Sequence, residues 1–143
     1  MHSEGDLLPY ELAEAYKGAD YDFMMLPEQF AGQCEPPVVD ARAMRTNSFS
    51  IIVGAVLKAP HTAVGESWHI IAAGLPLDFE PCNKDEPGPA LARRAAKAGA
   101  FISIAHPTWS HLTAEDGHSI DVAHAVEVYN HGCTIQSGRG DGW

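Results

Sequence analysis

The chain has 143 residues, of which 45% are hydrophobic and 20% are charged, as in one soluble globular domain. This length allows a substantial core but is short for a closed α/β barrel, which typically has about 250 residues. The net charge of −10 argues against nucleic-acid or membrane-surface binding and suits either solubility or cation binding.

The first third of the chain contains signals for a helix and a strand. Good helix formers dominate Leu8–Lys17, and Gly18 is a typical helix stop, so a helix is predicted there. The apolar run Tyr21–Leu26 has the length of a short strand. Ala31–Asn47 contains Gly and Pro and little periodicity, which predicts a loop followed by a short helix over Asp40–Arg45.

The central part of the chain alternates apolar runs with connections. Phe49–Leu57 is rich in Ile and Val, and His69–Gly74 is a second apolar run, so both are predicted to be buried strands. Lys58–Ser67 is the loop between them, and the proline-containing Phe79–Pro89 is a second connection. Pro89–Ala98 is rich in Ala and Arg and is followed by Gly, which predicts a helix.

The last third contains two further strand signals, Phe101–Ala105 and Ala125–Tyr129. The tail Gly132–Trp143 has four glycines and no periodic pattern. Strands that alternate with helices favour parallel βαβ units. The predicted fold is therefore α/β, either open or part of a barrel.

The cysteines and the N-terminus bear on the cellular compartment. Cys34, Cys82 and Cys133 are odd in number, far apart and without a CxxC pair, so neither a zinc ribbon nor a disulfide framework is indicated. No charged and then apolar N-terminal segment resembles a signal peptide, and no apolar run is long enough to span a bilayer. We therefore expect a cytoplasmic protein.

Histidine is unusually frequent in a chain of this size, with eight residues: His2, His61, His69, His106, His111, His118, His124 and His131. Neutral imidazole is a common ligand of transition metals, although most histidines simply lie at protein surfaces. His106 follows a predicted strand and precedes Pro107, which holds it rigidly at the mouth of the sheet. His69 opens another predicted strand.

Other short motifs in the sequence are weaker evidence for a function. His2, Glu4 and Asp6 place an imidazole and two carboxylates within five residues, a cluster that can bind a cation on a turn. The sequence has no Walker loop and no GxSxG elbow. The segment GRGDG near the end follows no recognisable strand, and its RGD tripeptide is close to a chance match.

In order, five segments resemble motifs of the polymerase and histidinol phosphatase (PHP) domain family: HSEGDLLPYELAEAYKGADYDFMMLPEQF, IIVGAVLKAP, WHIIAAGLP, FISIAHPTW and AVEVYNHGC. Together they cover nearly the whole chain. The resemblance implies one domain over residues 1–143, with an incomplete distorted (βα) barrel, shortened at both ends relative to the family. It implies a metal-dependent phosphoesterase that holds Mn, Zn or Fe and attacks a small phosphorylated substrate with an activated water.

The ligand positions can be carried over residue by residue. His2 matches the second histidine of the family's HxH pair, and Glu4 stands where an aspartate is usual. His69 and His106 match two further histidine ligands. The resemblance therefore implies His2, Glu4, His69 and His106 as metal ligands.

The sequence departs from the family at other ligand positions. Met1 stands where the first histidine of HxH is expected, and Pro27-Glu28-Gln29 replaces Thr-Asp-His. Val56 replaces the glutamate of Gly-x-Glu. Valine binds no metal, and neutral glutamine is a poor ligand beside imidazole. Either the fold has outlived its chemistry, or the chain is a partial or altered form of an active protein.

Three functions remain open from the sequence. The first is phosphoester hydrolysis, and the second is a catalytically inactive binding module, which Val56 and Gln29 favour. The third is a scaffold that self-associates through open barrel edges. Glu28, Glu127, Asn130 and His131 are candidate cleft residues, although capping of a strand end explains Glu127 and Asn130 equally well. The remaining histidines are expected on the surface or in loops.

Overall fold

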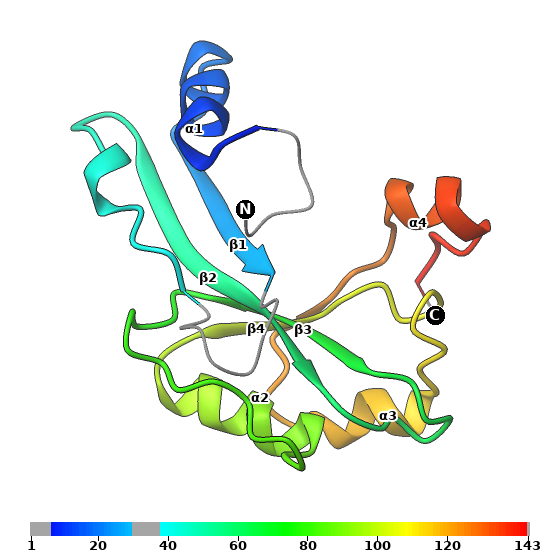
Figure 1. Cartoon of the computed structure of the whole chain (residues 1–143). Helices are drawn as coiled ribbons and strands as arrows, with labels where there is room; N and C mark the ends of the chain where they lie inside the picture. The colour runs from blue at the N-terminus through cyan, green and yellow to red at the C-terminus, as the bar shows by residue number, and fades with distance from the viewer. Residues whose placement is uncertain (1–6, 30–37, 143) are drawn as a thin grey trace.

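The computed structural model describes residues 7–29 and 38–142 and shows an α/β fold (Figure 1). The strands are β1 (Phe23–Gln29), β2 (Ser50–Ala59), β3 (Trp68–Ala73), β4 (Phe101–Ile104) and β5 (Ala125–Val126). The helices are α1 (Pro9–Gly18), the 3-10 turn η1 (Arg42–Met44), α2 (Gly88–Lys97), α3 (Ala114–Ser119) and α4 (His131–Ser137). Within these ranges no helix is long and apolar enough to cross a membrane.

The strands form one open mixed sheet in the order β1-β2-β3-β4-β5. The outer pairs, β1 with β2 and β4 with β5, are parallel, whereas β2–β3 and β3–β4 are antiparallel. The prediction of parallel βαβ units is therefore wrong for the centre of the sheet. Only residues 60–67 join β2 to β3, and a parallel crossover needs a dozen or more residues.

One face of the central strands packs on α2 and forms the main core. Its strand residues alternate along the chain, as expected of side chains that point to one face: Leu57, Ala59, Trp68, Ile70, Ala72, Ile102 and Ile104. Leu91, Ala92 and Ala95 of α2 meet them. Gly88 starts this helix against the Trp68 ring, where an added Cβ would lie 2.5 Å from the indole Cγ. A smaller core joins α1 to β1 and the start of β2.

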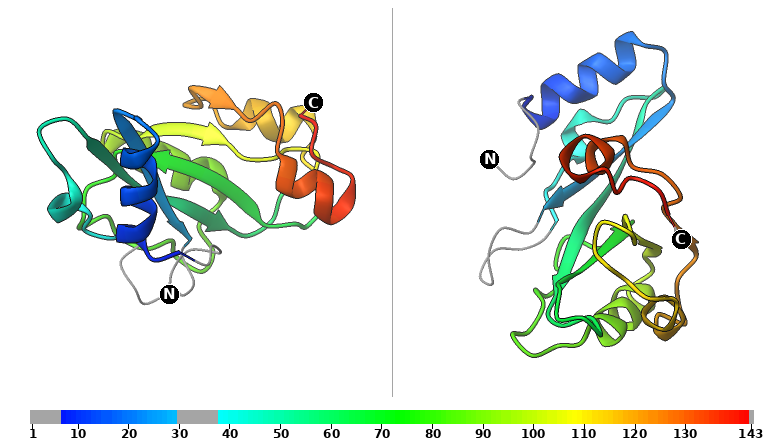
Figure 2. Two further views of the ribbon diagram at one scale, coloured as in Figure 1. Left: turned by 90° about the horizontal axis from the view of Figure 1, so that it is seen from above. Right: turned by 90° about the vertical axis from the view of Figure 1, so that its right-hand side faces the viewer.

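The opposite face of the central strands is half-buried and carries polar side chains. Val56 pairs with Ile71, and Lys58 pairs with His69, so these four side chains project from the same face of the β2–β3 ladder. Figure 1 and the two views of Figure 2 place α4 on this open side, across the sheet from α2. The candidate site lies here.

The last third of the chain differs from the sequence prediction in the end of β5 and in two additional short helices. β5 ends at Val126 rather than at residue 129, because the next residues turn toward α4. Thr113 caps α3 by accepting a hydrogen bond from the backbone N–H of Asp116. Asn130 caps α4, which ends at Gly138 with a left-handed φ of 70°. These helices have six and seven residues, too few to show a helical period in the sequence.

Candidate functional site

A cavity of about 430 Å³ lies on the open face of the sheet. Its lining comes from β2, β3, the segment after β4, the segment after β5, and α4. The lining residues are Val56, His69, Ile71, Ala105, His106, Trp109, Glu127, Asn130, Gly132, Cys133 and Gln136. Segments distant in sequence therefore converge on one pocket.

Two histidines face each other in this cavity. His69 Nδ1 lies 3.4 Å from His106 Nε2, and the two rings meet edge to face with centroids 5.1 Å apart. His69 belongs to β3, whereas His106 follows the neighbouring strand β4. The two side chains meet because the β3–β4 ladder brings the start of one strand beside the end of the other.

The backbone of His106 is held in an unusual conformation. Its φ is +25°, in a region that residues other than glycine rarely adopt. Its N–H donates to Glu127 Oε2 at 2.7 Å, and its carbonyl accepts from the Ser110 N–H at 3.1 Å. Such strain is typical of functional sites, where surrounding contacts over-determine the geometry.

The buried hydroxyl of Ser110 orients the His106 ring. Ser110 Oγ lies 2.9 Å from His106 Nδ1, and Ser110 is only 3% exposed. When Nδ1 carries the proton and donates it to this hydroxyl, the lone pair of Nε2 points toward His69. This is how a partner of a histidine ligand selects the tautomer that can bind a metal.

His69 is held in its neutral form. Burial, assisted by the positive charges of His106 and Lys58, lowers the pKa of His69 to about 4. A neutral imidazole keeps its lone pair available at neutral pH, as a metal ligand requires.

Trp109 forms an aromatic wall beside both rings. Its ring centroid lies 5.6 Å from that of His69 and 4.9 Å from that of His106, with an edge-on arrangement at His106. These contacts restrict the rotation of both imidazoles.

Glu127 and Asn130 join the cavity to α4. Asn130 Nδ2 donates to Glu127 Oε1 at 3.1 Å, while Asn130 Oδ1 accepts from the Cys133 N–H at 3.0 Å. The same two residues therefore brace His106 and cap the helix. Burial, assisted by the negative charge of Glu127, raises the pKa of the Cys133 thiol, so Cys133 is a protonated thiol at neutral pH.

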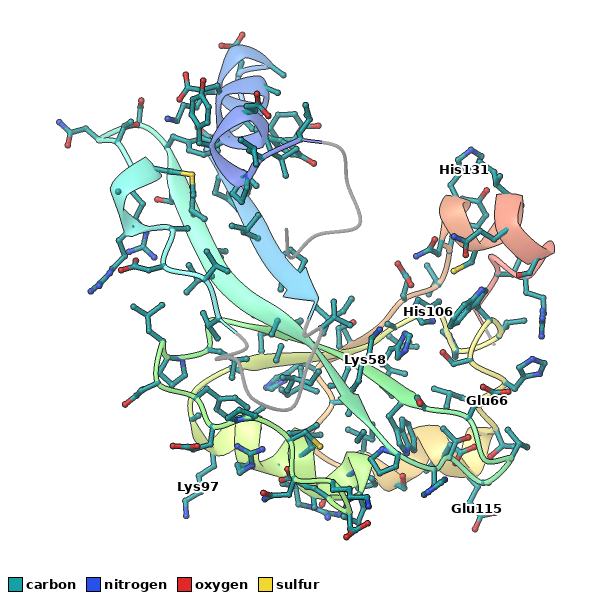
Figure 3. All side chains as sticks on the ribbon, viewed as in Figure 1. Lys58, Glu66, Lys97, His106, Glu115 and His131 are labelled. Atoms are coloured by element: carbon teal, nitrogen blue, oxygen red, sulfur yellow. The ribbon has the colours of Figure 1, made fainter. Side chains whose placement is uncertain are left out.

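The structure brings together four of the residues that the sequence singled out: His69, His106, Glu127 and Asn130 all line the cavity. His131 does not line it; its Nδ1 lies 3.1 Å from the Tyr129 hydroxyl, and Figure 3 shows it on the outer side of α4. The predicted ligands His2 and Glu4, and the side chain of Glu28, lie outside the described residues. The expectation of exposed positions for the other described histidines is confirmed.

Sequence reasoning missed Trp109, Ser110 and Cys133. The serine could have been found, because Ser110 follows His106 by four residues, a spacing at which a turn lets its hydroxyl reach back to the ring. No sequence signal placed Cys133 in the site. It lies on α4, and the pattern of residues 132–143 did not predict a helix there.

The imidazoles of His69 and His106 face each other in the cavity at a separation of 3.4 Å. In residues 7–29 and 38–142, no group of three His, Cys, Asp or Glu side chains is close enough to hold a metal ion by itself. A complete site therefore needs further ligands, from elsewhere in the chain or from water or substrate.

Comparison of the sequence with models of known protein families finds no match, and comparison with curated proteins finds no significant one. The assignment of a function therefore depends on the geometry of this cavity and on the ordered motifs of the sequence.

Proposed function

We propose that the chain is a metal-dependent phosphoesterase of the PHP type, in which His69 and His106 bind the same divalent ion. Mn, Zn and Fe all suit imidazole ligands. The substrate is a small phosphorylated molecule that enters the cavity of about 430 Å³. The motifs that resemble the PHP family supply His2 and Glu4 as further ligands.

The separation of the two imidazole nitrogens carries this proposal. Two nitrogens that each lie about 2.0–2.1 Å from one tetrahedral ion are roughly 3.3 Å apart. His69 Nδ1 and His106 Nε2 are 3.4 Å apart, which fits this spacing. A hydrogen bond between two ring nitrogens is usually shorter, at about 3.0 Å. The separation therefore fits a shared metal ion and lies at the long end of the range for a mutual hydrogen bond.

The surrounding side chains fit a metal site in three further ways. Ser110 can hold the His106 tautomer that frees Nε2, and burial keeps His69 neutral. Trp109 packs against both rings and limits their rotation. A divalent ion, when bound, supplies Lewis acidity and lowers the pKa of a water molecule for attack on phosphorus.

We also propose that the open sheet is part of a PHP-type barrel. In this arrangement the half-buried face with Lys58, His69 and the cavity faces the barrel interior, where the metal site of such a barrel lies. The antiparallel centre of the sheet sets it apart from a regular parallel barrel. On this proposal β1 and β5, the edge strands, are the places where further strands or another copy of the chain would pair.

One observation favours the alternative, a binding or scaffold module without catalysis. Val56, which stands at the position of the family's Gly-x-Glu glutamate, lines the cavity directly opposite Ile71. An apolar pair therefore occupies this side of the pocket. A chain that holds one ion without this carboxylate can bind a phosphorylated ligand and still hydrolyse it slowly or not at all.

Metal content tests the proposal. The purified protein is loaded with Mn²⁺, Zn²⁺ or Fe²⁺, dialysed and measured by elemental analysis, next to His106→Ala and His118→Ala. His118 is an exposed histidine of α3 and serves as the matched control. We expect at least one bound equivalent in the parent and in the control and a loss in His106→Ala. Folded protein without bound metal, or equal binding in all three, overturns the proposal.

Phosphatase turnover then separates the two functions. If the metal-loaded protein hydrolyses p-nitrophenyl phosphate and His106→Ala does not, the enzyme proposal is supported. If the metal is bound but turnover is no faster than that of His106→Ala, the binding module is the better account.

A further inference from the structure

A lysine projects beside the two histidines. Lys58 of β2 is the direct cross-strand partner of His69 in the antiparallel ladder, which places their Cβ atoms about 5 Å apart on one face of the sheet. The neighbouring residues Leu57 and Ala59 point into the core on the other face. Figure 3 labels Lys58 close to His106, on the cavity side of the sheet.

The Lys58 ammonium has no acidic partner in the described part of the chain. The ion pairs there join other cations to carboxylates, namely Lys17–Glu14, Arg42–Asp40, Arg93–Asp121 and Arg94–Glu86. Lys58 is nevertheless half-buried, and its charge is one of the causes of the lowered pKa of His69.

An unpaired, half-buried cation lowers stability unless something compensates it. The chain carries nineteen acidic residues, yet none of those described pairs with Lys58. The Lys58 ammonium also repels a metal ion at the adjacent histidines. An anion bound between Lys58 and that metal ion would offset this repulsion. The position therefore indicates an anionic ligand.

We propose that Lys58 is the anion-recognition residue of the His69–His106 site and binds an oxygen of the substrate's phosphoryl group. This inference rests on the proposed function and extends it by naming the residue that selects for negative charge. The lysine ammonium offers three donors and a compact charge, which suits phosphate oxygens. Lys58 binds and positions the phosphoryl group, and no proton transfer is assigned to it.

Phosphate affinity tests the inference. Inorganic phosphate is titrated by calorimetry into the parent protein, Lys58→Met, Lys58→Arg and Lys97→Met, each with and without Mn²⁺. Lys97 ends α2 on the far side of the molecule and is the matched control for loss of one positive charge (Figure 3). We expect Lys58→Met to bind phosphate about tenfold more weakly, because a charge-assisted hydrogen bond is lost. Lys58→Arg and Lys97→Met should keep most of the affinity.

The Mn²⁺ affinity of the same variants separates recognition from structural damage. Removal of a positive charge next to His69 should leave Mn²⁺ binding unchanged or make it roughly two- to fivefold tighter. Weaker phosphate binding together with equal or tighter Mn²⁺ binding supports the inference. Equal loss of both affinities indicates a damaged site and overturns it.

The outcome also distinguishes this inference from the proposed function. If the parent binds no Mn²⁺, the proposed function fails, while the phosphate titration of the metal-free protein still decides the role of Lys58. Phosphate affinity that is the same in the parent and in Lys58→Met, with and without Mn²⁺, overturns the inference even when the metal binds.

Discussion

Replacement of Ser110 by alanine tests how the site holds His106. The Ser110 hydroxyl lies 2.9 Å from His106 Nδ1 and is almost fully buried. Loss of this hydrogen bond should lower the free energy of unfolding by about 1 kcal/mol. Loss of an orienting partner typically weakens metal binding at a histidine ligand by about 10- to 100-fold, or roughly 1.4–2.7 kcal/mol.

Two measurements on the same variant distinguish these effects. Urea denaturation in the presence of a chelator gives the change in stability, and competition with a chelating dye gives the metal affinity. Ser119→Ala is the matched control, because the Ser119 hydroxyl donates to the Asp116 carbonyl at 2.6 Å and Ser119 does not line the cavity. We expect a similar loss of stability in both variants and a loss of metal affinity in Ser110→Ala alone. Equal metal affinity in the two variants would refute the reasoning.

Three further predictions concern the packing of Gly88, the pH dependence of stability and the partly buried ion pair of Arg94. Gly88→Ala should lower the free energy of unfolding by roughly 1–3 kcal/mol in urea denaturation, because its Cβ meets the Trp68 ring. The pKa of His69 is about 4 in the folded state against 6.5 when unfolded, so the metal-free protein should lose stability as the pH falls from 6.5 toward 4. After allowance for partial exposure the loss is roughly 1–2 kcal/mol, and His69→Gln should reduce it. Arg94→Met should lower the melting temperature and expose the segment before α2 to proteases, because Arg94 pairs with Glu86 at 2.8 Å and donates to two carbonyls of that segment.

Much of the fold could be predicted from the sequence, because the apolar runs and helix stops are local signals. The glycine after α2 and the Ile- and Val-rich run of β2 predicted those elements within two residues of their observed ends. The direction of the strands could not be predicted, since it depends on how residues 60–67 turn. The two short helices α3 and α4 were missed because their signals are single caps, Thr113 and Asn130, rather than a repeating apolar pattern.

The candidate site was predictable only in part, for a similar reason. His106 stood out because it follows a strand and precedes a proline, and His69 because it opens a strand. Their meeting depends on the register between β3 and β4, which no local pattern encodes. The position of Lys58 opposite His69 depends in the same way on the register between β2 and β3.

X-ray absorption at the metal edge of the Zn²⁺- or Mn²⁺-loaded protein tests the central claim most directly. The account predicts two imidazole nitrogens in the first coordination shell, at about 2.0–2.1 Å for zinc. His69→Ala and His106→Ala should each remove at least one of them, and His118→Ala should remove neither. A shell that contains oxygen alone, or one that is unchanged when either His69 or His106 is replaced, would contradict the account.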